Sequence, residues 1–196
     1  MAKYSNANLI DEELSLIGST NFIGKMFHKM NKSSIILLSI QVPLNLYLRA
    51  EVFCEDIQDL SEMEFIQNDL MKLLYNDFLT FAKKNPDPRA IFKLLTSLER
   101  QAGKDSSLEK KTDSVFQLVQ RETHQEMQPL HLRMRRKSAL RGEILLADME
   151  EVQQHHGYTL ERVFELLYID FIDKFRKGNN VEAMNTILRI LDSEEE

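Results

Sequence analysis

The segment LLYNDF (residues 73–78) returns near the end of the chain as LLYIDF (residues 166–171), 93 residues later. Identical residues continue at the same offset: Lys84 with Lys177, Ala90 with Ala183, Leu95 with Leu188 and Leu98 with Leu191. Toward the N-terminus the offset becomes 92, and residues 48–60 align with residues 140–152. A register kept over such a length indicates an internal duplication, so we expect two related halves.

The length of the repeat limits the architecture. A unit of roughly 90 residues is longer than the units of about 20–50 residues that build stacked repeat proteins. We therefore predict a mostly α (α+β) fold with pseudo-twofold symmetry. Each half is expected to contain a short strand and three or four helices and to end in a helical hairpin. Residues 1–100 and 114–196 are the predicted repeats, and the polar, aperiodic residues 101–113 are the predicted linker.

One short strand is predicted in each half from alternating apolar residues. These residues are Leu38, Ile40 and Val42 in the first half and Leu130, Leu132 and Met134 in the second. Pro43 ends the first alternation, because proline cannot continue the ladder of an inner strand. Since an isolated strand needs a partner, we expect the two strands to pair with each other across the pseudo-twofold axis.

Apolar residues at helical spacing predict the remaining elements. Residues 9–17 and 19–30 indicate two helices separated at Gly18, and the segments after both strands keep a helical stripe. A long helix is predicted over residues 61–84, with Ser61 as its N-cap, and Pro88 is expected to open the next helix. Thr159 is the predicted cap of the corresponding helix in the second half.

Composition narrows the class of protein. The chain has 196 residues and a formal net charge of −6, which disfavours general coating of nucleic acid but leaves local basic patches open. The single cysteine, Cys54, excludes an intrachain disulfide and favours a reducing compartment. The longest apolar run, residues 35–48, is interrupted by polar residues and is shorter than the about 20 residues of a membrane helix. We expect a cytoplasmic protein that does not bind membranes.

The sequence contains none of the common catalytic signatures. There is no nucleophile elbow, phosphate-binding glycine loop or dinucleotide fingerprint. Cys54 lies beside an apolar stripe and is expected to be a buried, inert thiol. His155 and His156 precede Gly157 and are interpreted as surface residues of a loop. We therefore predict no catalytic residues, no cofactor and no enzymatic activity.

Polar residues shared by the halves allow two interpretations. They are Arg49 and Arg141, Glu51 and Glu143, Asp56 and Asp148, Asp77 and Asp170, and Tyr75 and Tyr168. Paired acids on facing helices can hold divalent metals, although no Glu-x-x-His motif accompanies them. The alternative is a role in helix packing, with the two arginines paired to acids of neighbouring helices and the tyrosine hydroxyls at the edge of the core. No metal ligand is assigned.

The best candidates for a specialised site lie where the halves differ. A basic cluster follows the second strand: His131, Arg133, Arg135, Arg136, Lys137 and Arg141. The first half has Leu44, Leu46 and Tyr47 at this junction, which could be core or a docking surface. Because the common fold cannot require the basic residues, we expect them to bind a phosphate, a nucleic-acid backbone or an acidic protein, unless nearby acids simply balance them in a solvated loop.

These observations predict a non-catalytic cytoplasmic regulatory or adaptor protein that binds another macromolecule, with a protein as the favoured partner. The alternative is a nucleic-acid-binding regulator that uses the arginine cluster of residues 133–141. A carboxylate-bridged metal protein is the third hypothesis. Self-association into an oligomer is compatible with all three.

Overall fold

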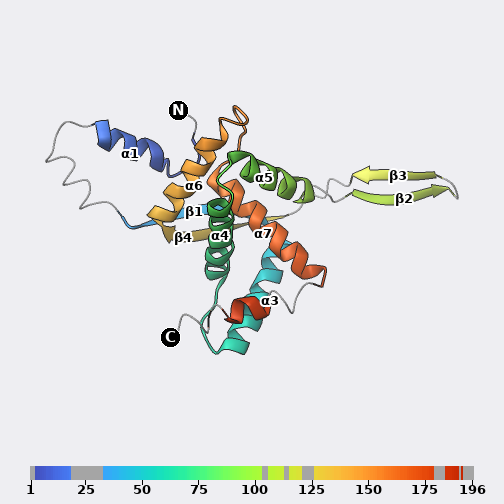
Figure 1. The fold of residues 1–196 in the computed structure, drawn as a ribbon. Helices are drawn as coiled ribbons and strands as arrows, with labels where there is room; N and C mark the ends of the chain where they lie inside the picture. Colours follow the sequence, from blue (N-terminus) through green and yellow to red (C-terminus); the bar gives the residue numbers. More distant parts are fainter. Residues whose placement is uncertain are drawn as a thin grey trace.

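The protein was analysed as a computed structural model that describes residues 3–18, 33–102, 106–112, 115–120, 126–178, 184–189 and 191. Most of the described residues lie in helices (Figure 1). Two antiparallel two-stranded sheets complete the described elements, and the predicted α+β class is confirmed. No helix in this part of the chain is long and apolar enough to cross a bilayer.

The two strands predicted from alternation pair with each other. Strand β1 (Ile35–Pro43) is antiparallel to β4 (Met127–Arg135), and we call this pair the ribbon. In the middle of the ribbon Ser39 lies opposite His131, and these two residues are 92 positions apart. Burial alternates along both strands, so the ribbon has one apolar face turned to the core and one outer face.

A similar series of helices follows each strand. After β1 come α3 (Leu44–Ser61), α4 (Gln67–Lys84) and α5 (Pro88–Ala102). After β4 come α6 (Arg136–Met149), α7 (Leu160–Arg176) and the helical residues 184–189. The predicted opening of α5 at Pro88 and the predicted cap of α7 at Thr159 are both confirmed, since the Thr159 side chain accepts from the backbone N–H of Arg162.

Backbone hydrogen bonds tie each helix that follows a strand to the opposite strand. The N–H of Leu44, at the start of α3, donates to the carbonyl of Glu126 at 2.8 Å. The N–H of Arg136, at the start of α6, donates to the carbonyl of Ser34 at 2.8 Å. Both ends of the ribbon are therefore joined to a helix by the same kind of bond.

The repeated hexapeptides form packing seams in the core. Tyr75 and Tyr168 are fully buried, which places their rings inside the core rather than at its edge. The hydroxyl of Tyr75, on α4, donates to the carbonyl of Ser138 on α6 at 3.0 Å. That of Tyr168, on α7, donates to Oε1 of Gln67 on α4 at 2.7 Å. Each tyrosine therefore joins helices that belong to different halves of the sequence.

Three local predictions need correction or lie outside the described residues. Ser61 does not cap the long helix, because it ends α3 and its hydroxyl donates to the carbonyl of Ile57. The predicted linker, residues 101–113, includes the end of α5 and the strand β2 (Ser106–Thr112), which pairs with β3 (Val115–Gln120). The helix predicted over residues 19–30 lies outside the described part of the chain.

The first helix is held against the body of the protein by a buried carboxylate. Helix α1 (Leu9–Gly18) begins next to Glu143 of α6, which is only 1% exposed. The Glu143 carboxylate accepts from the backbone N–H groups of Leu9 at 3.0 Å and Ile10 at 2.9 Å, and also from the hydroxyl of Ser5. It therefore caps α1 from another helix, where a negative charge is favoured by the helix dipole. In the described part of the chain Glu143 therefore bonds to the start of α1 rather than to an arginine, and Arg49 and Arg141 are exposed without an ion pair to the shared acids.

Replacing Glu143 by Gln is expected to loosen α1. The amide can accept only through one oxygen, and its N–H₂ group would face backbone donors, so we expect the free energy of unfolding to fall by about 2 kcal/mol. Hydrogen exchange should become faster at the amides of Leu9 and Ile10. Glu161→Gln is the matched control, because the Glu161 carboxylate accepts from the backbone N–H of Asn6, which lies before the start of α1. An equal effect of the two substitutions would contradict the capping role.

Candidate nucleic-acid interface

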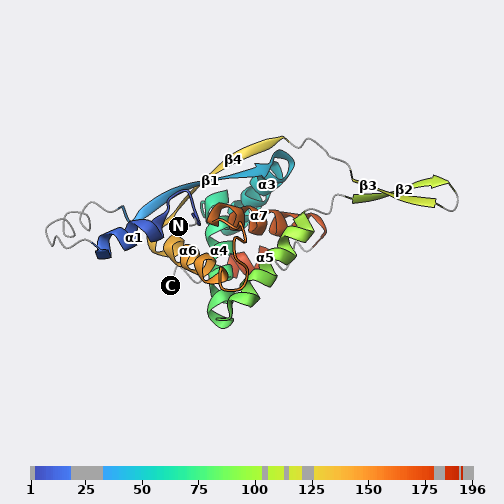
Figure 2. The ribbon, with the colours of Figure 1, turned by 90° about the horizontal axis from the view of Figure 1, so that it is seen from above.

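The outer face of the ribbon is a row of exposed side chains. On β1 they are Ile35, Leu37, Ser39 and Gln41, and on β4 they are Met127, Pro129, His131, Arg133 and Arg135. Figure 2 shows that helices α4, α5, α6 and α7 lie on the same side of the ribbon, against its apolar face. Among the residues that the structure describes, the outward side chains of the opposite face are exposed and can meet another molecule.

The outer face has an unusual charge. Neither strand of the ribbon contains Asp or Glu, although the chain has 31 acidic residues among 196. Arg133 and Arg135 project from β4, with His131 two residues before Arg133. A chain with a net negative charge thus has no acids in either ribbon strand and has arginines on the outer face, which favours a negatively charged ligand.

The two long edges of the ribbon are covered by side chains from the helices. The backbone N–H of Gln41 donates to the carboxylate of Glu165 on α7 at 3.1 Å. On the other edge the N–H of Arg133 donates to Oδ1 of Asn68 on α4 at 2.8 Å. Open edges invite the addition of further strands, and these two contacts work against such pairing. The ribbon is thus suited to contacts through its face.

The structure separates the predicted basic cluster into two groups. His131, Arg133 and Arg135 share the outer face of the ribbon, and Lys137 and Arg141 are exposed on α6. Arg136 does not belong with them, because its side chain is only 13% exposed and its guanidinium contacts Glu12 at 2.6 Å and Glu13 at 3.4 Å. Nearby acids therefore balance the charge of Arg136, as the alternative interpretation of the cluster predicts. These acids belong to α1, which is distant in sequence.

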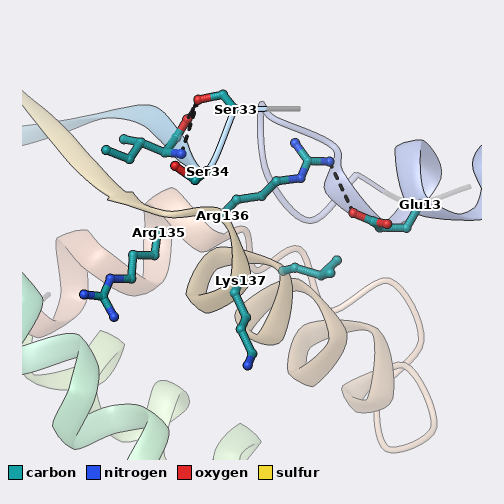
Figure 3. Close-up of a pocket in the computed structure, with 8 residues that line it drawn as sticks. Glu13, Ser33, Ser34, Arg135, Arg136 and Lys137 are labelled. Carbon is teal, nitrogen blue, oxygen red and sulfur yellow. Dashed lines mark hydrogen bonds and ion pairs between the residues drawn. The ribbon is translucent and has the colours of Figure 1, made fainter. Parts of the chain in front are cut away.

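A shallow pocket lies where the ribbon ends and α6 begins. Its volume is about 560 Å³. It is lined by Glu13, Ser33, Ser34, Ile35, Arg135, Arg136, Lys137 and Leu140. In Figure 3 Arg136 reaches toward Glu13, while Arg135 and Lys137 point away from this ion pair. Among the described residues that line the pocket, Arg135 and Lys137 are thus the cations that remain open to solvent.

The apolar junction of the first half does not form an exposed docking surface. Leu46 is only 6% exposed, Tyr47 packs against the core, and Leu44 is half-buried. The core interpretation therefore holds for Leu46 and Tyr47. Of the exposed large apolar side chains in the described residues, Leu37 on the ribbon is the most exposed, at 71%, followed by residues of α3 such as Leu60 and Leu48. Alternation could have identified Leu37, because it is adjacent to the inward-facing Leu38.

The interpretation of His156 as a surface residue is wrong. Its side chain is only 1% exposed. Its Nε2 lies 2.9 Å from the carbonyl of Leu146, and its Nδ1 accepts from the N–H of Tyr158 at 3.0 Å. These contacts assign the proton of the neutral ring to Nε2.

Within the described ranges, no group of three or more His, Cys, Asp or Glu residues is arranged to hold a metal ion.

Cys54 is buried, as predicted, and burial together with the nearby Glu51 raises the pKa of its thiol to about 12. The thiolate is the reactive form, so we expect no reaction with iodoacetamide at pH 8 in the folded protein and full reaction after denaturation. Because the folded pKa is raised, this group should also reduce stability as the pH rises above about 9, where the unfolded thiol ionises first. Mass spectrometry of alkylated protein tests the first expectation. Labelling of the native protein at the rate of a free thiol would contradict it.

Comparison with known proteins gives no match: no protein family, curated protein or solved structure is similar to the chain.

Proposed function

We propose that this chain is a non-catalytic regulator that binds duplex DNA by placing the outer face of the ribbon in the major groove. The observation that carries this proposal is the outer face itself, whose described side chains are exposed, with arginines on one strand and helices α4, α5, α6 and α7 on the other side of the ribbon. The major groove is about 12 Å wide and admits either a helix or a two-stranded ribbon. Proteins that read DNA with strands in a groove form an established class.

The dimensions of the ribbon suit this groove. Its strands have nine residues each, which corresponds to a length of about 30 Å at about 3.3 Å per residue. The two strands are about 4.8 Å apart, so the pair with its side chains fits between the groove walls. Successive outward side chains are about 7 Å apart, which spaces them along roughly two base pairs each.

The outward side chains have the chemistry that base edges require. Arginine donates two hydrogen bonds to O6 and N7 of guanine, and glutamine bonds in the same bidentate way to adenine. Arg133 and Gln41 lie on the outer face and can make these contacts. Leu37 can contact the methyl group of thymine, which gives a role to an otherwise unexplained exposed leucine. Arg135 and Lys137, near the end of the ribbon, are placed for phosphate contacts.

We also propose that the two halves of the chain derive from one duplicated strand–helix–helix unit. The 92-residue offset of the sequence repeat equals the separation of Ser39 and His131, which pair at the middle of the ribbon. The same offset relates the two bonds at the ends of the ribbon: the donors Leu44 and Arg136 are 92 residues apart, and so are the acceptors Ser34 and Glu126. On this basis one chain contains both strands of the ribbon, which two copies of a smaller protein would otherwise supply as a dimer.

The sequence alone favoured a protein partner, and the geometry favours DNA over it. A docking site for a protein is usually built around a buried apolar or aromatic centre. On the ribbon, polar and basic side chains occupy the middle and one end of the outer face, and the flanking Ile35 and Leu37 lie opposite arginines. Polar and basic side chains that follow one another along a narrow ribbon are suited to contact successive base edges.

The first experiment measures binding to a pool of random-sequence duplexes at several salt concentrations. We expect binding whose affinity falls steeply with salt, with a slope of log affinity against log salt of about −0.9 for each phosphate neutralised. Selection from the pool should enrich a defined sequence. If no duplex is retained at low salt, while an acidic protein from the native cell binds through the ribbon, the DNA proposal is wrong and the adaptor hypothesis gains.

A further inference from the structure

We infer that the DNA site of this chain is non-palindromic and is bound in one orientation. The inference rests on the proposed function and concerns which DNA the ribbon selects. The backbone of the ribbon is close to twofold symmetric. The outward side chains at equivalent positions are different, and the inference follows from this difference.

The register of the ribbon defines an approximate twofold axis. The pair Ser39 and His131 is the fifth of nine pairs, so it lies at the centre. A half-turn about an axis through this pair exchanges the strands. It brings Arg133 to the position of Gln41 and Leu37 to the position of Pro129. In dimeric DNA-binding proteins such an axis matches a palindromic site, because both halves of the site meet the same side chains.

Here the two ends of the outer face present different chemistry. The outward pairs are Leu37 with Arg133 and Ile35 with Arg135 at one end, and Gln41 with Pro129, followed by Met127, at the other. One end therefore carries two guanidinium groups and two aliphatic side chains. The other end carries a neutral amide flanked by Pro129 and Met127.

This difference predicts different bases at equivalent distances from the centre. Arg133 is suited to guanine, and Gln41, its image, is suited to adenine. A bidentate contact discriminates between bases by an amount that corresponds to about 5-fold to 150-fold in affinity. We expect a loss of this size when the half of the site that faces Arg133 is replaced by a copy of the other half.

The orientation on DNA can be read with a cleavage reagent tethered at either end of the ribbon. Ser34 and Glu126 are exposed and lie at opposite ends, where their carbonyls accept from Arg136 and Leu44. Ser34→Cys and Glu126→Cys in the full chain, each carrying an iron chelate, place hydroxyl-radical cleavage at the two ends. The buried Cys54 does not compete for the reagent.

On the selected duplex, each tethered protein is expected to cleave at one end of the site, and the two proteins at opposite ends. The matched variant is Arg133→Gln, which places glutamine at both image positions. In this background the preference for one orientation should fall, so that each tether cleaves at both ends.

Four outcomes would contradict the inference or one of its steps. A palindromic selected sequence, or equal cleavage at both ends by the unsubstituted ribbon, contradicts single orientation while leaving DNA binding in place. Cleavage that stays at one end in the Arg133→Gln background shows that Arg133 does not set the orientation. Absence of any salt-dependent duplex binding removes the proposed function, and the inference with it.

Discussion

Replacing both Arg133 and Arg135 by alanine is expected to lower affinity for the selected duplex by about 100-fold. Arg133 contributes a base contact worth about 1–3 kcal/mol, and the loss of Arg135 removes a further positive charge beside the phosphates. Both side chains are exposed on the outer face of the ribbon, so the fold should be retained. Fluorescence anisotropy with labelled duplex measures the affinity, and circular dichroism verifies the fold.

The matched control removes the same charge elsewhere. Lys83 and Lys84 are exposed at the end of α4, and the double substitution Lys83→Ala with Lys84→Ala changes the net charge equally. We expect less than a threefold change in affinity, because general attraction between protein and DNA is screened beyond about 10 Å. Equal losses in the two double variants would show that net charge, rather than the ribbon, determines binding.

Replacing Gly142 by Ala is expected to produce the largest loss of stability, about 3 kcal/mol. A Cβ atom at this position would collide with the hydroxyl of Tyr75 and would lie 2.8 Å from Cδ1 of Leu160. Relief of the clash displaces the Tyr75 hydroxyl from the Ser138 carbonyl, to which it donates at 3.0 Å. This cost exceeds the gain of about 1 kcal/mol that alanine brings to a helix. Thermal or urea unfolding measures the change.

The control for Gly142→Ala is a double-mutant cycle with Tyr75→Phe. Removing the hydroxyl makes room for the new methyl group, so the double variant should be more stable than the sum of the single effects predicts. We expect a coupling free energy of at least about 1 kcal/mol. Strict additivity would mean that the contact between these two residues does not limit packing. The cycle also tests the seam formed by the repeated hexapeptide, since Tyr75 belongs to it.

Local pattern predicted much of the fold. Alternation identified both ribbon strands because one face of each is buried against helices, and this two-residue period is visible in a single strand. Two lone strands could be paired with each other since neither had another predicted partner. The same alternation implies which residues face outward, including Leu37 and Arg133.

The errors concern residues whose contacts differ from those that the surrounding sequence suggests. Arg136 was grouped with the other arginines because it is adjacent to them in sequence, yet acids of α1 bind it. His156 lies in a loop sequence but its ring is enclosed by Leu146 and Tyr158. Ser61 resembles a cap, whereas its hydroxyl bonds back to Ile57 inside α3. Only the acids that bind Arg136 are distant in sequence, and they cannot be recognised from the pattern around it. The partners of Ser61 and His156 lie within ten residues and compete with the predicted roles.

Protection of the selected duplex from dimethyl sulfate tests the central claim most directly, because this reagent methylates guanine N7 in the major groove and adenine N3 in the minor groove. We predict that the bound protein protects guanine N7 within the site and leaves adenine N3 reactive. The Arg133→Ala variant should restore reactivity at the guanine that faces Arg133. Protection of adenine N3 without protection of guanine N7 would contradict insertion of the ribbon into the major groove.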